Sequence, residues 1–397
     1  MSRFLFVVPP FARHIRPTVG VAGELATRGH DVAWVGEADA LATVLPGWAR
    51  VHGCAAAPVR PRPDRLGGSD AVQHLWERVL VPITETMVSG VENAVLAERP
   101  DVLVADQQAF AGALVAERMG IPWATSAASS AELTGPRGYS PQVRDWVRGH
   151  LDALRARFGD AARTGDVRFS PYLVLAFTSP ALAGDRVASD VVQFVGPVRR
   201  ERTGPTDFPW QSIDGEHPLV YITLGAVGGA ASERFLAECV RALRARPRMR
   251  AVIADPAGAL GEVPGNVVVR DRVPQRELLD HADVVLCHGG HGTVCEALSR
   301  GLPLVVAPVR DCQPIVAEQV EQVGVGTRLR LTHARAEHIG DAIDATLTDP
   351  SYRRAAGEVA MSFLGSGGER AAADRLELVS RTHPSPNLPG GRDPSPL

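Results

Sequence analysis

The sequence of 397 residues predicts an α/β protein built from two doubly wound domains. Residues 284–307 read as a buried strand, a glycine-rich turn, a helix and a second buried strand, and residues 4–35 show the same order. A unit of this kind forms a parallel strand pair with a right-handed crossover. Because 397 residues exceed the size of one average domain, we expect each half to carry its own parallel sheet.

The composition argues against several classes of partner. The sequence has 42 Lys and Arg against 45 Asp and Glu, and it has no cluster of basic residues of the kind that binds nucleic acid or a membrane surface. We therefore expect neither as a partner. No apolar run reaches membrane-spanning length, and the N-terminal FLFVVPPF reads as a strand, not as a signal peptide. The five cysteines form no C-x-x-C pair, which is typical of a reduced cytoplasmic protein.

Two polar residues of the first half are expected at the functional edge of its sheet. The half should begin with a strand, a loop, a helix and a second strand, over Phe4–Val8, 9–16, Pro17–Arg28 and Asp31–Val35. His14 falls in that loop, and Asp106 ends a further strand, Asp101–Ala105. Ligands of doubly wound sheets bind at the carboxyl ends of the strands, so both side chains lie where chemistry is expected.

The glycine-rich turn of the second half, 288–292, favours an anion. Glycines allow a ligand to approach the backbone, and the first N–H groups of a helix are unpaired and carry partial positive charge. We expect the helix over Thr293–Arg300, with Thr293 as its N-cap and Glu296 completing a capping box. The alternative is a plain βαβ turn whose glycines serve packing. No third ligand accompanies His288 and His291, and there is no D-x-D pair, so no metal is expected.

Several separated motifs resemble the family 1 glycosyltransferases, nucleotide-sugar-dependent enzymes of the GT-B fold, and most closely those of bacterial natural-product pathways. They run in order through most of residues 3–375: VVPPFARHIRPTVGVAGELATRGHDVAWVG, VYITLGA, RVPQRELLDHAD, HGGHGT-x-x-E and APVRDCQPIVAEQV. The resemblance implies two Rossmann-like domains facing a central cleft, with a C-terminal helix that returns to the first domain.

The domain boundaries follow from the resemblance together with composition. Residues 1–200 form an N-terminal acceptor-binding domain, and residues 201–216 form a polar linker interrupted by prolines. Residues 217–370 form a C-terminal nucleotide-sugar-binding domain, and residues 371–382 form a helix that packs on the first domain. Residues 383–397 are expected to be a disordered tail.

The resemblance also assigns the donor site. The residues expected at the nucleotide and its phosphates are Gly225, Arg272, Val273, Gln275, His288, Gly290, Gly292, Thr293 and Glu296. Arg272 stands where many relatives stack an aromatic ring on the base, and Glu296 would bind the ribose hydroxyls. Asp311, Cys312 and Gln313 are expected at the donor sugar. Cys312 replaces a carboxylate of the family, and because a thiol is a weak hydrogen-bond partner, a deoxysugar would lose less here than a fully hydroxylated one.

His14 is expected to be the general base and Asp106 the carboxylate that orients it, by the same resemblance. Acceptor contacts are expected from Arg13, Trp76, Phe110 and Trp146. Arg13 stands where relatives usually have glycine, and the helix that carries Trp146 is equally explained by packing alone.

The function predicted in this way is inverting transfer of a sugar from a dTDP- or UDP-sugar to a hydroxyl of a small hydrophobic acceptor. The donor would be a co-substrate, no cofactor is expected, and the protein would be a monomer or a homodimer. One alternative is a nucleotide-sugar epimerase or hydrolase, which would convert the donor alone. A second is a non-catalytic nucleotide-sugar-binding subunit, which would bind the donor without turnover.

Overall fold

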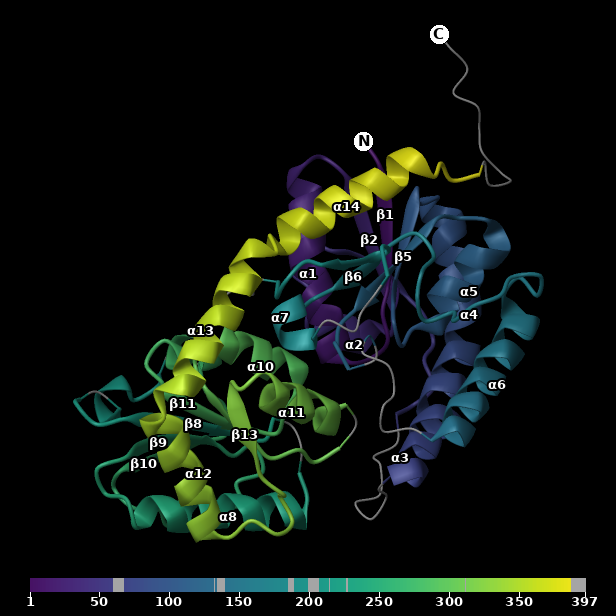
Figure 1. The fold of residues 1–397 in the computed structure, drawn as a ribbon. Helices are drawn as coiled ribbons and strands as arrows, with labels where there is room; N and C mark the ends of the chain where they lie inside the picture. Colours follow the sequence, from purple (N-terminus) through teal and green to yellow (C-terminus); the bar gives the residue numbers. More distant parts are fainter. Residues whose placement is uncertain are drawn as a thin grey trace.

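The computed structural model of the chain shows two α/β domains, each built on its own parallel sheet (Figure 1). The described residues are 1–59, 68–131, 133, 140–184, 189–198, 207–213, 215–225, 228–310 and 312–386. The predicted fold class is therefore confirmed.

The first sheet has seven strands in the order β3-β2-β1-β4-β5-β6-β7. They are β1 Arg3–Val7, β2 Asp31–Gly36, β3 Arg50–Gly53, β4 Val102–Asp106, β5 Trp123–Ala127, β6 Val174–Ala176 and β7 Val192–Phe194. The order reverses between β1 and β4, which are neighbours with Val7 opposite Ala105. A reversal of this kind opens a crevice at the carboxyl ends of the two strands, the usual ligand position in such sheets.

Helices cover both faces of the first sheet (Figure 1). They are α1 Ala12–Thr27, α2 Ala38–Ala42, α3 Gly68–Leu75, the π-helical turn η1 Trp76–Leu80, α4 Val81–Glu98, α5 Phe110–Met119, α6 Pro141–Phe158 and α7 Pro180–Ala183. The continuous helical run Ser69–Glu98 is long and apolar enough to cross a membrane by length and composition alone. Half of its most apolar window is buried inside the protein, where Met87 and Val91 belong to the domain core.

The second sheet has six strands in the order β10-β9-β8-β11-β12-β13. They are β8 Leu219–Thr223, β9 Arg250–Ala254, β10 Val267–Arg270, β11 Val284–Cys287, β12 Leu304–Val306 and β13 Gly326–Arg328. Its helical elements are η2 Trp210–Ser212, α8 Ala230–Arg244, α9 Gln275–Leu279, α10 His291–Leu298, α11 Gln313–Gln322, α12 Ala336–Thr348 and α13 Pro350–Gly365. The predicted strand, glycine turn, helix and strand unit is β11, α10 and β12.

The C-terminal helix α14, Gly368–Thr382, lies on the first domain as predicted (Figure 1). Its Leu376 is buried in the same core cluster as Phe4, and Arg28 of α1 pairs with Asp374 at 2.6 Å. The helix begins three residues before the predicted 371–382. The residues that follow it also make a contact, because the His383 ring lies 4.5 Å from the Tyr172 ring. Of the predicted disordered tail, 387–397 lie outside the described residues.

Parts of the predicted linker pack on the second domain. Phe208 and Ile213 are buried in the core cluster that also contains Leu219 and Tyr221. These two apolar side chains interrupt the polar run 201–216 and explain why it is not a free linker along its described length. Residues 201–206 and 214 lie outside the described residues.

The prediction that residues 9–16 form a loop is wrong. Helix α1 begins at Ala12, so His14 lies in its first turn and Pro17 lies inside it. Proline is favoured at the first position of a helix, which suggested that the helix begins there. Inside α1, Pro17 instead removes one intrahelical hydrogen bond and crowds the carbonyl four residues before it. Burial explains the earlier start, because Ile15 is fully buried.

Candidate functional site

His14 and Asp106 meet at the carboxyl edge of the first sheet. His14 Nδ1 lies 2.9 Å from Asp106 Oδ1, and both residues are buried. The adjacency of β1 and β4 brings the first turn of α1 to the end of β4. The same carboxylate oxygen accepts the Gln108 backbone N–H at 2.9 Å, which fixes its position. A carboxylate can only accept, so Nδ1 carries the proton and Nε2 keeps its lone pair, the tautomer that a base requires.

Buried polar atoms surround this pair. Asp106 Oδ2, the Ser126 hydroxyl and both side-chain amide atoms of Gln107 have no hydrogen-bond partner among the described residues. Ser126 lies opposite Asp106 in the pairing of β4 with β5. Buried polar groups are normally paired with protein or water. This edge of the sheet therefore has unused hydrogen-bonding capacity next to the dyad.

The anion-favouring turn of the second domain ends in α10, but its cap differs from the prediction. Gly290 is the N-cap, no side chain caps the helix, and Thr293 is its third residue, so the predicted capping box is absent. The earlier start places Val294 on the fully buried face. The first intrahelical bond runs from the Val294 N–H to the Gly290 carbonyl at 3.0 Å. The three preceding N–H groups have no intrahelical acceptor and can bind an anion.

Two glycines make room for the His288 ring. A Cβ atom on Gly290 would lie 2.4 Å from His288 Nε2, and a Cβ atom on Gly225 would lie 3.0 Å from Cε1. Gly225 also has a φ of +63°, which favours glycine on its own account. The ring is therefore held between the turn after β8 and the N-cap of α10, in the place where the sequence predicts phosphate. The glycines therefore have a packing role here, and the anion site at this turn stays a prediction.

His288 is neutral at physiological pH. Burial is the main cause that lowers the pKa of the ring to about 4; a hydrogen bond with the Thr223 backbone opposes it, and the charges of Arg310 and Arg13 add to it. His288 Nδ1 has no partner among the described residues. Arg13 comes from the first domain, is exposed, and has its guanidinium 5.1 Å from the centre of the Phe11 ring. Arg13 thus adds positive potential to the predicted phosphate site, although the sequence assigned it to the acceptor.

The residues predicted at the nucleoside form a hydrogen-bonded chain. The Tyr221 hydroxyl donates to Gln275 Oε1 at 3.1 Å, and Gln275 Nε2 donates to Glu296 Oε2. Burial raises the pKa of the Tyr221 hydroxyl, so it remains a donor at any physiological pH. Val273 is half-buried and packs against the hydrophobic core of the second domain, whereas Arg272 is exposed. The structure therefore joins Gln275 and Glu296 directly and leaves the Arg272 side chain at the surface.

The loop predicted to bind the sugar is fixed by Gln313. Its Oε1 accepts the backbone N–H groups of Val309 and Arg310, each at 2.9 Å. This acceptor is therefore occupied, and Gln313 can offer a ligand only the N–H groups of its amide. Cys312 is the N-cap of α11 and is partly exposed. Asp311 lies outside the described residues.

His291 holds the two domains together. Its Nε2 lies 3.2 Å from the Phe177 carbonyl oxygen and its Nδ1 lies 3.3 Å from the Ser130 hydroxyl, both in the first domain. The Ser130 hydroxyl also donates to Gln319 Oε1 at 2.8 Å. Among the described residues, no group of three or more His, Cys, Asp or Glu side chains is arranged to hold a metal ion.

The aromatic residues predicted at the acceptor form one cluster. The rings of Trp76 and Phe110 stack at 5.4 Å, the His150 ring lies 6.4 Å from Trp76, and Trp146 meets His150 edge to face at 4.4 Å. Trp76 and Phe110 are buried in the core of the first domain, and Trp146 is half-buried. The structure thus brings the three predicted residues together, with Trp146 the most exposed of them.

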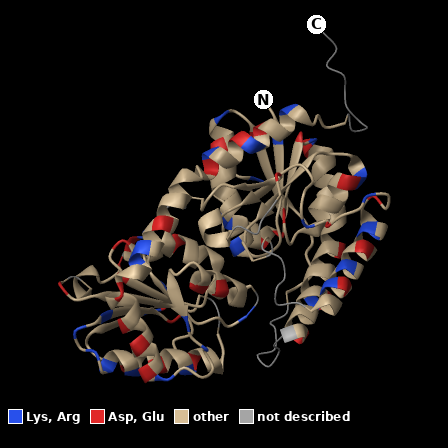
Figure 2. Cartoon of the chain, in the orientation of Figure 1, with Lys and Arg blue, Asp and Glu red and all other residues tan. Residues whose placement is uncertain are grey.

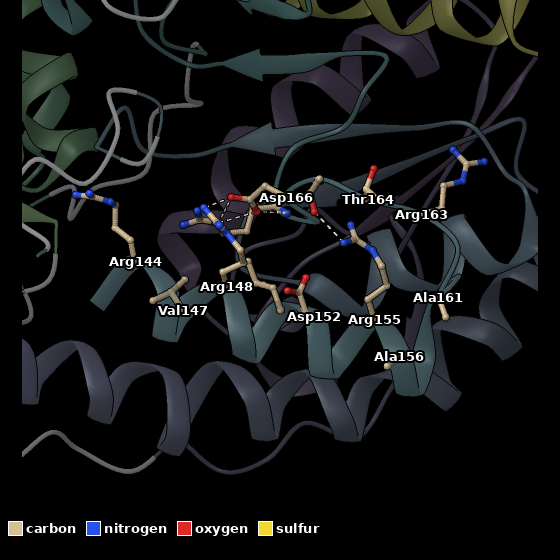
Figure 3. A pocket seen from close by; sticks show the side chains of 13 residues that line it. Arg144, Val147, Arg148, Asp152, Arg155, Ala156, Ala161, Arg163, Thr164 and Asp166 are labelled. Atoms are coloured by element: carbon tan, nitrogen blue, oxygen red, sulfur yellow. Dashed lines mark hydrogen bonds and ion pairs between the residues drawn. The ribbon is translucent and has the colours of Figure 1, made fainter. Parts of the chain in front are cut away.

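A cavity of about 690 Å³ lies elsewhere, between α6 and residues 161–168 (Figure 3). Figure 1 places α6 on the side of the first domain away from α10. Arg155 in this cavity pairs with Glu117 at 3.0 Å, and Arg168 pairs with Asp166. Figure 2 shows basic and acidic residues intermixed along α6. We assign no part of the reaction to this cavity.

Known proteins share both the sequence pattern and the fold. The family model "Erythromycin biosynthesis protein CIII-like, C-terminal domain" matches residues 250–377. The chain is 30% identical to 4'-demethylrebeccamycin synthase of Lentzea aerocolonigenes, over 95% of this chain and 99% of the relative. It is 29% identical to demethyllactenocin mycarosyltransferase of Streptomyces fradiae, over 95% and 86% of the two chains. The chain belongs to the family 1 glycosyltransferases of natural-product biosynthesis.

Solved structures agree with this assignment. The glycosyltransferase of kitacinnamycin superposes on this glycosyltransferase with a TM-score of 0.79 and 26% identity, over 95% of this chain and 99% of that one. The calicheamicin glycosyltransferase CalG4 gives a TM-score of 0.77 at 24% identity, over 97% and 100%, and shows the shared fold. The protein is therefore an enzyme of the GT-B fold that transfers a sugar.

Sequence reasoning missed several residues of this glycosyltransferase. Tyr221 orients Gln275, Ser130 bridges to His291, and Arg310 adds charge near His288. Tyr221 and Ser130 are single polar residues within or just beyond strands, and the sequence pattern around them indicates only a strand. Arg310 was visible inside APVRDCQ, and its basic side chain beside the predicted sugar residues was the signal that could have found it.

Proposed function

We propose that this glycosyltransferase moves a sugar from a dTDP- or UDP-sugar to a hydroxyl of a small hydrophobic natural product, with inversion at the anomeric carbon. The observation that carries the proposal is the buried His14–Asp106 hydrogen bond of 2.9 Å at the sheet edge. Among relatives, a solved spinosyn rhamnosyltransferase of the same fold holds thymidine diphosphate. The enzyme is proposed to act in the cytoplasm, as a monomer or homodimer.

The proposed step needs no covalent intermediate on the protein. His14 Nε2 accepts the proton of the acceptor hydroxyl as that oxygen attacks the anomeric carbon. The bond between the anomeric carbon and the phosphate oxygen breaks, and the nucleoside diphosphate leaves with the bonding electrons. Asp106 stabilises the imidazolium that forms at His14. The backbone N–H groups at the start of α10 stabilise the charge on the departing phosphate, and Arg13 and Arg310 add positive potential.

The leaving-group site provides charge stabilisation from protein groups alone. We propose that catalysis needs no metal or other cofactor, because unpaired helix N–H groups and two arginines converge near His288. Titrating the purified enzyme with a chelator tests this directly. Unchanged turnover is expected, whereas activity that is lost and then restored by a divalent cation would overturn the proposal.

His14→Ala tests the base. A positioned general base contributes about 10²–10⁴-fold, so turnover on an aliphatic alcohol should fall by at least about 10²-fold while donor affinity is unchanged. Asp106→Asn should act in the same direction, since it no longer stabilises the imidazolium. His52→Ala is a matched control, because His52 Nε2 bonds with Glu98 Oε1 at 2.6 Å on the edge strand β3, away from the dyad.

Product analysis discriminates the proposal from its alternatives. Mass spectrometry of a donor panel incubated with polyphenolic or polyketide acceptors should show a mass increase equal to one sugar. Conversion of the donor in the absence of acceptor would instead indicate an epimerase or hydrolase. Wild-type turnover by His14→Ala would require a base other than His14.

A further inference from the structure

A second polar cavity, of about 570 Å³, lies at the carboxyl edge of the second sheet. Three segments line it: the loop and first turn of α8 over 228–232, the turn after β12 over 308–310, and the residues after β13 up to His333. These segments come together because Arg234 of α8 donates to the Leu331 carbonyl at 2.9 Å. Among the donor residues that were assigned from sequence and are described in the structure, none lines this cavity.

The lining of this cavity is positively charged. Among the described residues it includes Arg310, Arg328 and Arg330, and it includes no Asp or Glu. Arg328 is compensated by Glu321, whose Oε2 lies 3.0 Å from its Nε. Arg310 follows β12 and Arg330 follows the neighbouring strand β13, and both line the cavity. A cavity with this charge balance attracts an anion.

The start of α8 supplies hydrogen-bond donors to the same space. Its N-cap is Gly229, which offers no side-chain cap, and the helix continues for 15 residues. The first N–H groups of such a helix are unpaired and carry partial positive charge. Ser232, in the first turn, lines the cavity, is only 4% exposed, and has a hydroxyl without a hydrogen-bond partner among the described residues. A buried hydroxyl of this kind indicates a missing ligand.

We propose that this cavity is a second anion site, which binds a carboxylate or phosphate group beside the donor site through the first turn of α8, Ser232, Arg310 and Arg330. The position suggests two sources for the anion. Arg310 lies two residues before Cys312, so a carboxylate on the donor sugar could reach the cavity, an assignment that rests on the proposed function. Since Cys312 replaces a carboxylate, no like charge at that position repels an acidic sugar. The second source is free phosphate.

The first experiment titrates inorganic phosphate into the full-length enzyme by calorimetry at low ionic strength. Because the proposed leaving-group site also takes phosphate, it is first saturated with a nucleoside diphosphate. One phosphate site is then expected, and Arg310→Gln and Arg330→Gln should each weaken it by about threefold to tenfold, the range for one partly exposed charge-assisted contact. Ser232→Ala should weaken it as well. Arg244→Gln is the matched control, because it removes the same charge at the far end of α8. Phosphate should still bind when the donor site is saturated with a nucleoside diphosphate.

The second experiment distinguishes the sources. Wild-type enzyme is offered a nucleoside diphosphate uronate in competition with the corresponding neutral hexose donor. A preference for the uronate that falls about threefold to tenfold in Arg330→Gln, and is unchanged in Arg244→Gln, assigns the site to the donor sugar. Phosphate binding without any uronate preference assigns it to the free anion.

The proposal is overturned if neither phosphate nor the uronate carboxylate depends on Arg310 and Arg330. It is also overturned if a saturating nucleoside diphosphate abolishes phosphate binding, since the cavity would then be the leaving-group site itself. Neither result contradicts the proposed function, because the proposed function depends on His14 and on turnover with an acceptor. Loss of His14-dependent turnover would conversely leave phosphate binding in this cavity unaffected.

Discussion

Donor binding is expected to be coupled to protonation of His288. In the free enzyme the pKa of this ring is lowered to about 4, chiefly by burial, so the ring is neutral at pH 7. Its proton faces the Thr223 backbone, and Nδ1 has no partner among the described residues. A neutral ring in this state presents a lone pair, not a proton, at Nδ1. A hydrogen bond from Nδ1 to a phosphate oxygen therefore requires a second proton.

The size of the pKa shift of His288 follows from the negative charge that the donor diphosphate brings close to the ring. A unit negative charge about 4 Å from the ring, at an effective dielectric constant of about 20, contributes about 4 kcal/mol, or about three pKa units. Added to a starting pKa of about 4, this gives about 7 in the complex. At pH 7 about half a proton should be taken up for each donor bound, rising toward one at pH 6 and falling toward zero at pH 8. Because the pKa rises on binding, donor affinity should increase as pH falls through 7 and should level off below 4.

Calorimetry in two buffers of different ionisation enthalpy measures this uptake. The ligand should be an intact nucleotide sugar without acceptor, since its diphosphate is esterified at both ends and does not titrate in this range. The dependence of the observed enthalpy on buffer ionisation enthalpy gives the number of protons. His288→Gln should abolish the dependence, and His281→Gln, which changes an exposed histidine of the same domain, should not. A buffer-independent enthalpy for the wild type at pH 7, or an unchanged slope in His288→Gln, would refute the reasoning.

Three further substitutions test the donor site and the domain contact. Cys312→Asp restores a carboxylate and should shift the competition between dTDP-glucose and a dideoxy donor toward glucose; an unchanged ratio would show that this position does not contact the sugar. Arg13→Gly removes a cation that lowers the pKa of His288 and should raise the donor KM severalfold with little change in kcat, and an unaltered KM would contradict its role at the phosphates. His291→Ala removes the ring's hydrogen bonds to the Phe177 carbonyl and the Ser130 hydroxyl, so the free energy of unfolding in urea should fall by about 1–3 kcal/mol. A loss below about 0.5 kcal/mol would contradict a stabilising role for this contact.

Much of the fold was predictable because its strands, turns and helices follow from patterns among residues that are close together in the sequence. Buried parallel strands read as short apolar runs, and glycines mark the turns between strand and helix. These signals placed β11, α10 and β12, and the ordered motifs placed His14 just after β1 and Asp106 at the end of β4. The start of α1 was not predictable in the same way. A proline at position 17 suggested a helix start, and only burial of Ile15 against the sheet decided that the helix begins at Ala12.

The sequence by itself determined the class of the protein, the two sheets and the residue types of the donor turn, because each depends on neighbours in the chain. The tertiary structure decided what those residues contact. His291 had no role assigned from the sequence, and the structure shows that its ring bonds to the first domain. Arg13, which the sequence assigned to the acceptor, also contributes positive potential at His288 of the other domain. The cavity at Ser232 joins segments about 100 residues apart in the chain. Such contacts depend on strand order and on the packing of one domain against the other, and no local spacing encodes them.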